Sequence, residues 1–421
     1  MAGYYWDQND NAERDAPLRF AYHAPELAQI LGLRADDDDH ECVLNTILTE
    51  LCLAAEADQA LSYSRRMASY TRSRYRPFVF GYTMMMRVVD QIVDAGLADE
   101  NRTRPGVRGW QSTIRATTDL YEAWLGMGVE PEYDASGETL VLKTRKTKTE
   151  PARLLEYADT MKHVRLRKAL RPVIEMLAAT EFGGLDSYRV RPNLLRFEKQ
   201  AFDRYGRPIT RVQHVRMVPA NGGRRIFCQN LNQHGRFYVW PQNLPNEARA
   251  VMTLNGERTT EIDYSAHHVR LAYSMLGKPI DGDAYDVGGD FIQDEVKVGT
   301  LISLNAGTPR EAAGALVQAR AEKGERMPWD RARRLIEAVR ERHAPIERAI
   351  CNDFGVRLMR ADSDIILGVT TDLEEAGIAS LPIHDSIITK ACFASQAMAK
   401  MEENWHRFAG HVNPCKVKKI R

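Results

Sequence analysis

Two aspartates lie at the ends of strand-like segments in the 421-residue chain. Asp263 lies within the alternating pattern TEIDYS, shortly before HHVRLAYSML, which has the spacing of a helix. Asp385 lies in a short polar turn between the apolar segments IASLPI and IITKA. A carboxylate beside apolar strands is unfavourable unless it binds something positive. These positions predict a cation-binding site where the strands end, and the mixture of helical and strand-like segments along the chain predicts an α+β fold.

Paired carboxylates at strand edges suit a two-metal phosphoryl-transfer site. Their oxygens are ligands that Mg²⁺ prefers, and two ions about 3.5–4 Å apart stabilise both the attacking and the leaving oxygen. Residues 291–316, between the two aspartates, are predicted to be helical, which places Lys297, Leu301 and Asn305 on one face. A lysine on that face can neutralise an incoming triphosphate.

The charge of the chain is unevenly distributed. The net charge is only +1, yet residues 143–225 carry 20 Lys and Arg against 8 Asp and Glu. Tyr188, Phe197 and Tyr205 are interspersed among these basic residues. Basic side chains track phosphates and aromatic rings stack on bases, so this region predicts contact with nucleic acid.

Other features exclude whole classes of protein. No apolar run approaches the roughly 18 residues of a membrane-spanning helix, and the first residues lack the pattern of a secretory signal. The six cysteines are scattered without a C-x-x-C pair, which argues against a zinc ribbon or a disulfide scaffold. We therefore expect no membrane partner and a reducing, cytoplasmic location.

The N-terminal part is predicted to hold an irregular segment (residues 1–40) and a mostly helical domain (41–128). Within the latter, two helices and a basic hairpin follow one another as in winged-helix domains, which this segment resembles. In such domains the second helix enters the major groove and the hairpin touches the backbone. The expected DNA contacts are Arg72, Arg74, Arg76 and Arg87, with Arg102, Arg104 and Arg108 in the hairpin.

The C-terminal part resembles family A nucleic-acid polymerases. EIDYSAHHVRLAY is similar to motif A of that family (DYSQIELRVLA), KVGTLISLNAG to motif B (KxxxFGxxYG), and PIHDSI to motif C (VHDE). HGRFYVWPQNLP is similar to the upstream TGRLSS…LQNIP segment, and residues 362–379 correspond to the helix before motif C. The order of the segments is preserved. The resemblance implies a right-hand polymerase, with a basic thumb-like or linker region (129–225) and a palm (226–421) containing reduced fingers (about 284–360).

The resemblance also implies roles for individual residues. Asp263 and Asp385 would hold two Mg²⁺ ions, for which Mn²⁺ can substitute, with a backbone carbonyl of Ile262 or Tyr264 as a further ligand. Nucleoside triphosphate and a DNA or RNA primer–template would be the partners. The expected nucleotide-binding residues are Lys297, His268, Leu301, Asn305, Tyr264 and Arg310, and the expected nucleic-acid-binding residues are Arg236, Gln242, Asn243, His384, Arg270, Arg224 and Arg225.

Several positions depart from the family pattern. His268 replaces the glutamate that helps to exclude ribonucleotides, and Leu301 and Asn305 replace aromatic residues of the fingers helix. Gln293 replaces an arginine that binds the triphosphate, so another cation is required, with Arg310 and Arg270 as candidates. The choice between deoxyribonucleotides and ribonucleotides therefore stays open.

We expect template-directed nucleotidyl transfer, with DNA-dependent DNA synthesis and no proofreading. One alternative is an RNA-synthesising, primase-like or template-independent nucleotidyltransferase, which His268 and Leu301 motivate. A second alternative, from another class, is a replication initiator that binds DNA with a catalytically degenerate palm. Magnesium-dependent incorporation of labelled nucleotides separates an enzyme from a binding protein.

Overall fold

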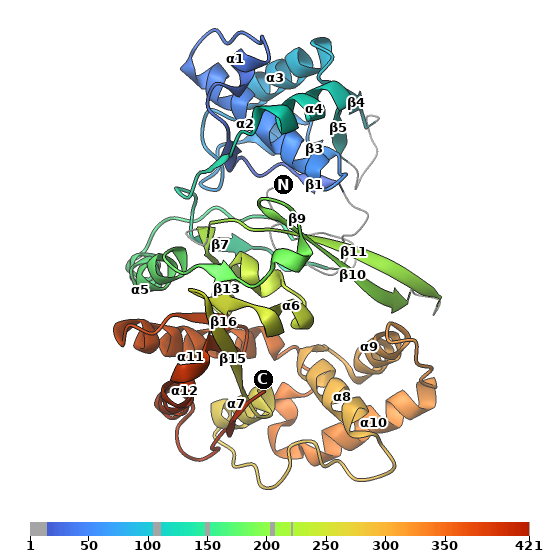
Figure 1. Ribbon diagram of the computed structural model, residues 1–421. Helices are drawn as coiled ribbons and strands as arrows, with labels where there is room; N and C mark the ends of the chain where they lie inside the picture. The colour runs from blue at the N-terminus through green and yellow to red at the C-terminus, as the bar shows by residue number, and fades with distance from the viewer. Residues whose placement is uncertain (1–14, 104–110, 148–151, 203–206, 220–221, 421) are drawn as a thin grey trace. The chain divides into compact units, whose positions relative to one another are not determined.

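The computed structural model describes residues 15–103, 111–147, 152–202, 207–219 and 222–420 (Figure 1). The chain forms two compact units. The first comprises Met1–Asp159, Tyr188–Arg196 and His214–Arg224, and the second comprises Thr160–Ser187, Phe197–Gln213 and Arg225–Arg421. Both units combine helices and strands, which confirms the predicted α+β class. The basic region 129–225 is divided between the two units.

The first unit is built around a buried helix, α2 (Asp38–Glu56). Asp37 caps this helix by accepting a hydrogen bond from the His40 N–H, and the acidic first turn complements the helix dipole. A four-stranded sheet has the order β1-β3-β5-β4, and β2 pairs with β6. The other elements are β1 (Ala16–Pro17), β2 (Tyr22–His23), α1 (Leu27–Ile30), β3 (Leu61–Tyr63), η1 (Met67–Tyr70), α3 (Tyr82–Asp94), β4 (Ala98–Asn101), β5 (Ser112–Ala116), α4 (Thr118–Met127), β6 (Glu132–Tyr133), β7 (Leu140–Lys143) and β9 (Arg189–Arg191).

The second unit contains the sheet that carries both aspartates. Its strands follow the order β16-β17-β15-β14-β8, and β18 also pairs with β15. Their bounds are β8 (Phe182–Gly183), β14 (Thr253–Leu254), β15 (Glu257–Tyr264), β16 (Ser380–Ile383), β17 (Ser386–Lys390) and β18 (Val417–Lys419). Ile262 pairs with Ile387 of β17 and with Lys419 of β18, so β15 is flanked on both sides at its C-terminal end.

Helices cover this sheet and extend beyond it (Figure 1). Helices α11 (Gly355–Glu375) and α12 (Ala394–Ala409) contact each other and the sheet. Helices α8 (Gln293–Asn305), α9 (Pro309–Ala321) and α10 (Trp329–Arg342) contact one another, and α8 also contacts α7 (His267–Met275) and α11. The remaining elements include α5 (Met161–Ala178), β10 (Leu194–Phe202), β11 (Pro208–Arg216), β12 (Arg224–Cys228), β13 (Asn230–Tyr238), η4 (Trp240–Asn243), α6 (Asn246–Val251) and η5 (Ala344–Ala349).

Two predicted helices differ from those observed. The segment 291–316 is not one helix, because α8 ends at Asn305 and α9 begins at Pro309. Thr308 accepts a hydrogen bond from the Glu311 N–H and so caps the N-terminus of α9. Proline is favoured at the first position of a helix but disrupts a helix interior, so Pro309 begins α9 and prevents α8 from continuing through it. The sequence also predicts a long basic helix over about 150–180, whereas the observed helix α5 begins only at Met161.

One hydrophobic core packs against the face of the sheet opposite to Asp263 in the second unit. Ile262 and Tyr264 point from β15 into this core, where Tyr264 packs beside Trp405 of α12. Because side chains alternate along a strand, Asp263 between them lies on the opposite face. None of the described helices is both long and apolar enough to cross a membrane.

Candidate active site around two aspartates

Strand pairing brings Asp263 and Asp385 to the same end of the sheet. Asp263 is the last residue of β15 to pair with β17, and its partner there is Ser386. Asp385 immediately precedes Ser386, in the two-residue turn that joins β16 to β17. His384, the first residue of this turn, has φ 54°. This left-handed conformation matches the tight hairpin turns that suit the twist of paired strands.

The two carboxylates repel each other in a partly buried setting. Burial and, next in size, the charge of Asp385 together raise the pKa of Asp263 to about 7, although Lys418 and the Tyr264 N–H act in the opposite direction. A raised carboxyl pKa means that the ionised form is disfavoured. A cation bound beside the carboxylates would favour the ionised form of Asp263.

The residues at this end of the sheet fit a magnesium site. Mg²⁺ in phosphate-transfer sites is commonly held by one or two carboxylates, with water and substrate phosphates completing its shell. Asp263 and Asp385 supply such carboxylates, and their shared charge favours a cation between them. The Ile262 and Tyr264 side chains are buried in the core, so only their backbone carbonyls could be ligands. Among the described residues, no group of three or more His, Cys, Asp or Glu could hold a metal ion.

A third aspartate, which the sequence reasoning missed, is fully buried beside this pair. Asp362 of α11 accepts hydrogen bonds at Oδ2 from Arg236 Nε (3.0 Å) and Nη2 (2.8 Å). His267 Nε2 lies 3.0 Å from Oδ1, and His268 Nε2 lies 3.8 Å from Oδ2. Burial opposes ionisation of Asp362, but Arg236 and the two histidines hold its pKa well below the usual range.

A sequence signal for Asp362 existed. Leu358, Ile365, Val369 and Leu373 form the buried stripe of α11, and Asp362 occupies a position on the same stripe. An acid on the apolar face of a helix requires a partner. The predicted helix before motif C therefore contained an unexplained buried charge.

The three α8 residues that were predicted to share one helix face are exposed in the structure. Lys297, Leu301 and Asn305 are all exposed, and Lys297 Nζ lies 5.8 Å from the centre of the Tyr285 ring. Burial raises the pKa of Tyr285 to about 12, with further contributions from Asp385, Asp283 and Asp263. Tyr285 thus lies within electrostatic range of both candidate ligands and contacts Lys297. It had no place in the sequence prediction.

Three side chains that were predicted to bind nucleic acid or nucleotide form hydrogen bonds within the second unit instead. Gln242 Nε2 donates to the Pro382 carbonyl at 2.6 Å, which anchors η4 to β16. Arg225 is buried and donates to Gly235 O, Ser363 Oγ and Asp364 Oδ1; burial lowers its pKa to about 10. The Tyr264 hydroxyl donates to the Met401 carbonyl. These three side chains hold the fold together, which argues against their predicted contacts with nucleic acid or nucleotide.

The side chains of Arg236 and His268 also point towards the buried Asp362. Arg236 Nη2 lies 3.2 Å from His268 Nε2, and both side chains face Asp362. Their side chains keep 14% and 15% exposure, so a ligand can still reach an edge of each. They therefore form a fixed pair rather than two independent, flexible contacts.

Other predicted residues retain unused polar atoms. Within the described part of the chain, Asn243 Oδ1, His384 Nδ1 and Arg270 Nε are buried without a hydrogen-bond partner. Burial lowers the pKa of His384 to about 4, and Arg236 contributes in the same direction, so its ring is neutral at pH 7. Arg310 is exposed at the start of α9, and Arg224 belongs to the first unit.

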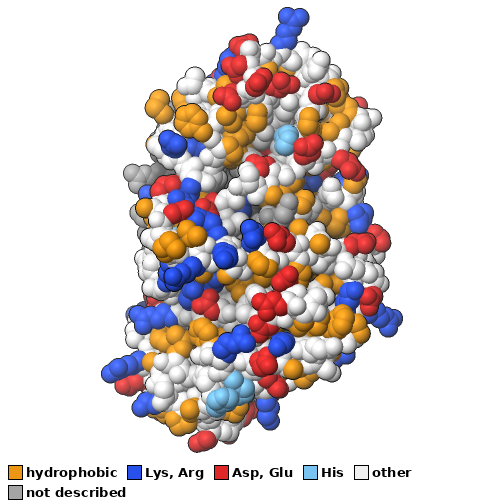
Figure 2. Space-filling model, turned by 90° about the vertical axis from the view of Figure 1, so that its left-hand side faces the viewer, with side chains coloured by type: hydrophobic (Ala, Val, Ile, Leu, Met, Phe, Trp, Pro, Cys, Tyr) orange, Lys and Arg blue, Asp and Glu red, His pale blue; other side chains and the backbone are white. Residues whose placement is uncertain are grey.

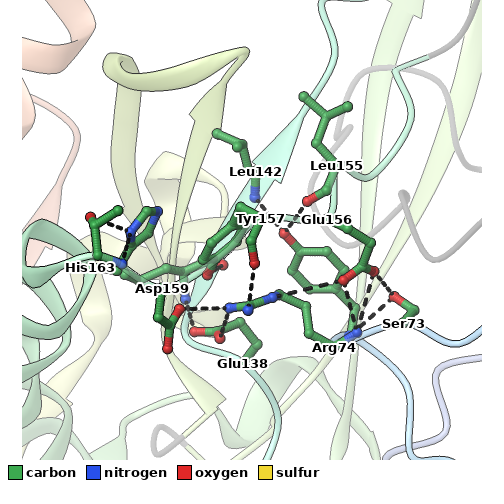
Figure 3. A network of polar contacts seen from close by, with 12 residues as sticks. Ser73, Arg74, Glu138, Leu142, Leu155, Glu156, Tyr157, Asp159 and His163 are labelled. Atoms are coloured by element: carbon green, nitrogen blue, oxygen red, sulfur yellow. Dashed lines mark hydrogen bonds and ion pairs between the residues drawn. The ribbon is translucent and has the colours of Figure 1, made fainter.

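The arginines predicted as winged-helix contacts are largely engaged within the first unit. Arg74 binds Glu138 and Asp159, each at 3.1 Å, and donates to the Tyr157 carbonyl (Figure 3). Its guanidinium also lies 3.7 Å from the centre of the Tyr157 ring. A guanidinium held by this many partners stabilises the unit, and releasing it to a phosphate would break them all.

The remaining basic residues of this segment follow the same trend. Arg87, on α3, pairs with Asp36, and Arg102 pairs with Glu100 and Asp90. Arg76 donates to the carbonyls of Ser69 and Thr71, and the Arg72 guanidinium lies over the Phe78 ring. Arg104 and Arg108 lie outside the described residues. Figure 2 shows blue and red side chains interspersed over one face of the molecule, as expected of pairing between opposite charges.

Comparisons with known proteins add no identification. No family model matches the chain, and no curated protein matches it. The functional conclusion therefore depends on the residues and geometry of the site.

Replacing Asp263 with asparagine should stabilise the metal-free protein at high pH. In the unfolded chain this carboxyl ionises near pH 4, whereas in the folded protein it resists ionisation until about pH 7. Wild-type stability therefore falls between these pH values, and Asp263→Asn escapes that loss. Because the side chain is partly exposed, we expect a gain on the order of 1 kcal/mol, about 2–4 °C in Tm, at pH 8 and little difference at pH 4.

The measurement is thermal unfolding at both pH values with and without Mg²⁺. Mg²⁺ should raise the Tm of the wild type at pH 8 but not that of Asp263→Asn. Asp281→Asn, at an exposed position, is the control. Equal responses of Asp263→Asn and the wild type to Mg²⁺ would contradict this assignment.

Removing the Asp362 charge should destabilise the second unit. Asp362→Asn leaves Arg236 buried without its counter-ion, which costs about 3–5 kcal/mol. The double variant Asp362→Asn, Arg236→Gln removes both charges and should recover a large part of this loss. Urea unfolding measures the wild type, Asp362→Asn, Arg236→Gln and the double variant, with the exposed Glu375→Gln on the same helix as the control. Additive losses in the double variant would show that the two side chains act independently.

Proposed function

We propose that this protein is a template-directed nucleotidyltransferase of the family A polymerase type. It would extend a primer by joining its 3′-hydroxyl to the α-phosphorus of a nucleoside triphosphate, with release of pyrophosphate. The observation that carries the proposal is the pairing of β15 with β17, which sets Asp263 beside the turn that holds Asp385. Two carboxylates at the same end of the sheet are the protein ligands that this chemistry needs.

Different residues would bind the metal ions, the phosphates and the primer end. Asp263 and Asp385 would hold two Mg²⁺ ions, which lower the pKa of the attacking hydroxyl and offset charge on the phosphates. Lys297, exposed on α8 and in contact with Tyr285, would bind the phosphates that leave. The neutral His384 and the Arg236–His268 pair would line the primer end.

Exposed basic residues of the second unit support a nucleic-acid partner. Arg165 and Lys168 are exposed on α5, and Lys199 and Arg211 are exposed on β10 and β11. All four belong to the basic region singled out by its charge. Phosphate contacts of this kind make affinity fall steeply with salt.

We assign the larger architecture on the same basis. The sheet of β14–β18 would be the palm, and the group α8–α10 would be a reduced set of fingers. In the first unit, the order β3-β5-β4 and the position of α3 before the β4–β5 hairpin support a winged-helix fold. The intramolecular pairing of Arg74, Arg87 and Arg102 argues against DNA contact through those side chains.

Primer extension tests the proposal directly. Each aspartate is expected to contribute several kcal/mol through the metal ions it holds, so Asp263→Ala and Asp385→Ala should each lose at least about 100-fold in kcat/KM. Asp281→Asn should retain wild-type activity. Undiminished activity in either alanine variant would overturn the assignment.

The same assay decides between the related activities. Each deoxyribonucleotide and ribonucleotide is supplied on a defined primer–template and without a template. Ribonucleotide incorporation would favour RNA synthesis, and incorporation without a template would favour a terminal transferase. Specific DNA binding with no incorporation of any nucleotide would favour a non-catalytic replication initiator.

A further inference from the structure

Strand β18 brings a lysine directly opposite Asp263. In the antiparallel pairing of β15 and β18, Asp263 is matched with Lys418, Ile262 with Lys419, and Tyr264 with Val417. Directly opposed residues of an antiparallel pair project from the same face, with Cβ atoms about 4.5–5.5 Å apart. Lys418 therefore shares the site face with Asp263, whereas Lys419 and Val417 belong to the face that carries Ile262 and Tyr264.

The register of β18 is fixed by buried polar contacts. Asn413, which is fully buried, accepts a hydrogen bond from the Ile280 N–H and donates to the Lys278 carbonyl, each at 2.8 Å. Trp405 Nε1 donates to the Asn413 carbonyl at 2.9 Å. Beyond the strand, the Ile420 N–H donates to the Glu261 carbonyl. A slip by one residue would break these bonds and move Lys418 to the other face.

The charge of Lys418 acts at the site, while its ammonium group stays accessible. Lys418 opposes the raised pKa of Asp263, and the residue is exposed. Arg236 is already held by Asp362, so it is poorly placed to serve as a second cation for an incoming ligand. Gln293 occupies the position at which the resemblance expected an arginine. A polyphosphate carries several negative charges, so a further cation beside Asp263 would add to the candidates Lys297, Arg270 and Arg310.

We propose that Lys418 is a phosphate-binding residue of this site and contacts the triphosphate of the incoming nucleotide. This inference rests on the proposed nucleotidyltransferase function and adds a residue from a strand outside all the recognised motifs. Arg270, whose Nε is buried without a partner among the described residues, lies on α7 near Cys415, just before β18. The segment that ends in β18 would thus supply part of the substrate site.

Neighbouring lysines provide a matched test. Nucleotide affinity is measured with Mg²⁺, a non-hydrolysable nucleoside triphosphate and a primer that lacks its 3′-hydroxyl, so that no turnover occurs. Lys418→Gln should weaken this affinity by about 10- to 100-fold, as expected for loss of a charge-assisted hydrogen bond. Lys418→Arg should stay close to the wild type. Lys419→Gln removes the same charge from the opposite face and should change affinity less than about threefold.

The outcomes separate the possible roles. Unchanged affinity in Lys418→Gln, or an equal loss in Lys419→Gln, would overturn the inference. If Lys418 served only as a counter-ion of Asp263, Lys418→Gln would alter the pH dependence of Mg²⁺ stabilisation without weakening nucleotide binding, which also overturns it. Thermal unfolding without nucleotide checks that each variant is folded.

The result is also distinguishable from failure of the proposed function. If the wild type binds nucleotide through Lys418 but incorporates none, the polymerase assignment fails and the binding site stands. If the wild type extends primers and Lys418→Gln extends them with an unchanged KM, the polymerase assignment stands and the role of Lys418 falls. Absence of any nucleotide binding by the wild type would overturn both.

Discussion

The fully buried carboxylate of Asp362 is the interaction on which the candidate site depends. It joins α11 to Arg236 on β13 and to His267 and His268 at the start of α7. A buried anion must be compensated, and here the compensating groups come from elements far apart in the sequence. The same α7 follows β15 directly, so the Asp362 network fixes the end of the strand that carries Asp263. The position of Asp263, a proposed metal ligand, is thereby tied to the packing of the second unit.

Much of the site could be predicted from local sequence. Asp263 at a strand-to-helix change and Asp385 in a turn between strands were both visible as interruptions of apolar patterns, and the structure has them there. Lys297, Leu301 and Asn305 share an exposed face as their spacing predicted. These features depend on residues within a few positions of one another. Periodicity reports such local relationships reliably.

The long-range features were not predictable in this way. The match of Asp263 with Lys418 depends on β18, a three-residue strand with no recognisable pattern of its own. Arg225 and Gln242 looked like surface contacts, yet their side chains form buried hydrogen bonds. Charge counts cannot distinguish a solvated arginine from a paired one. Arg74 illustrates this most clearly, because its network spans residues more than 80 positions apart.

The central claim is that Asp263 and Asp385 together hold two metal ions. Electron paramagnetic resonance of the full chain with Mn²⁺ and a non-hydrolysable nucleoside triphosphate measures this directly, because two neighbouring Mn²⁺ ions give a spin-coupled signal. The account predicts two coupled ions per chain, and loss of the coupling in both Asp263→Asn and Asp385→Asn. Isolated Mn²⁺ signals in the wild type, or coupling that persists in either variant, would contradict it.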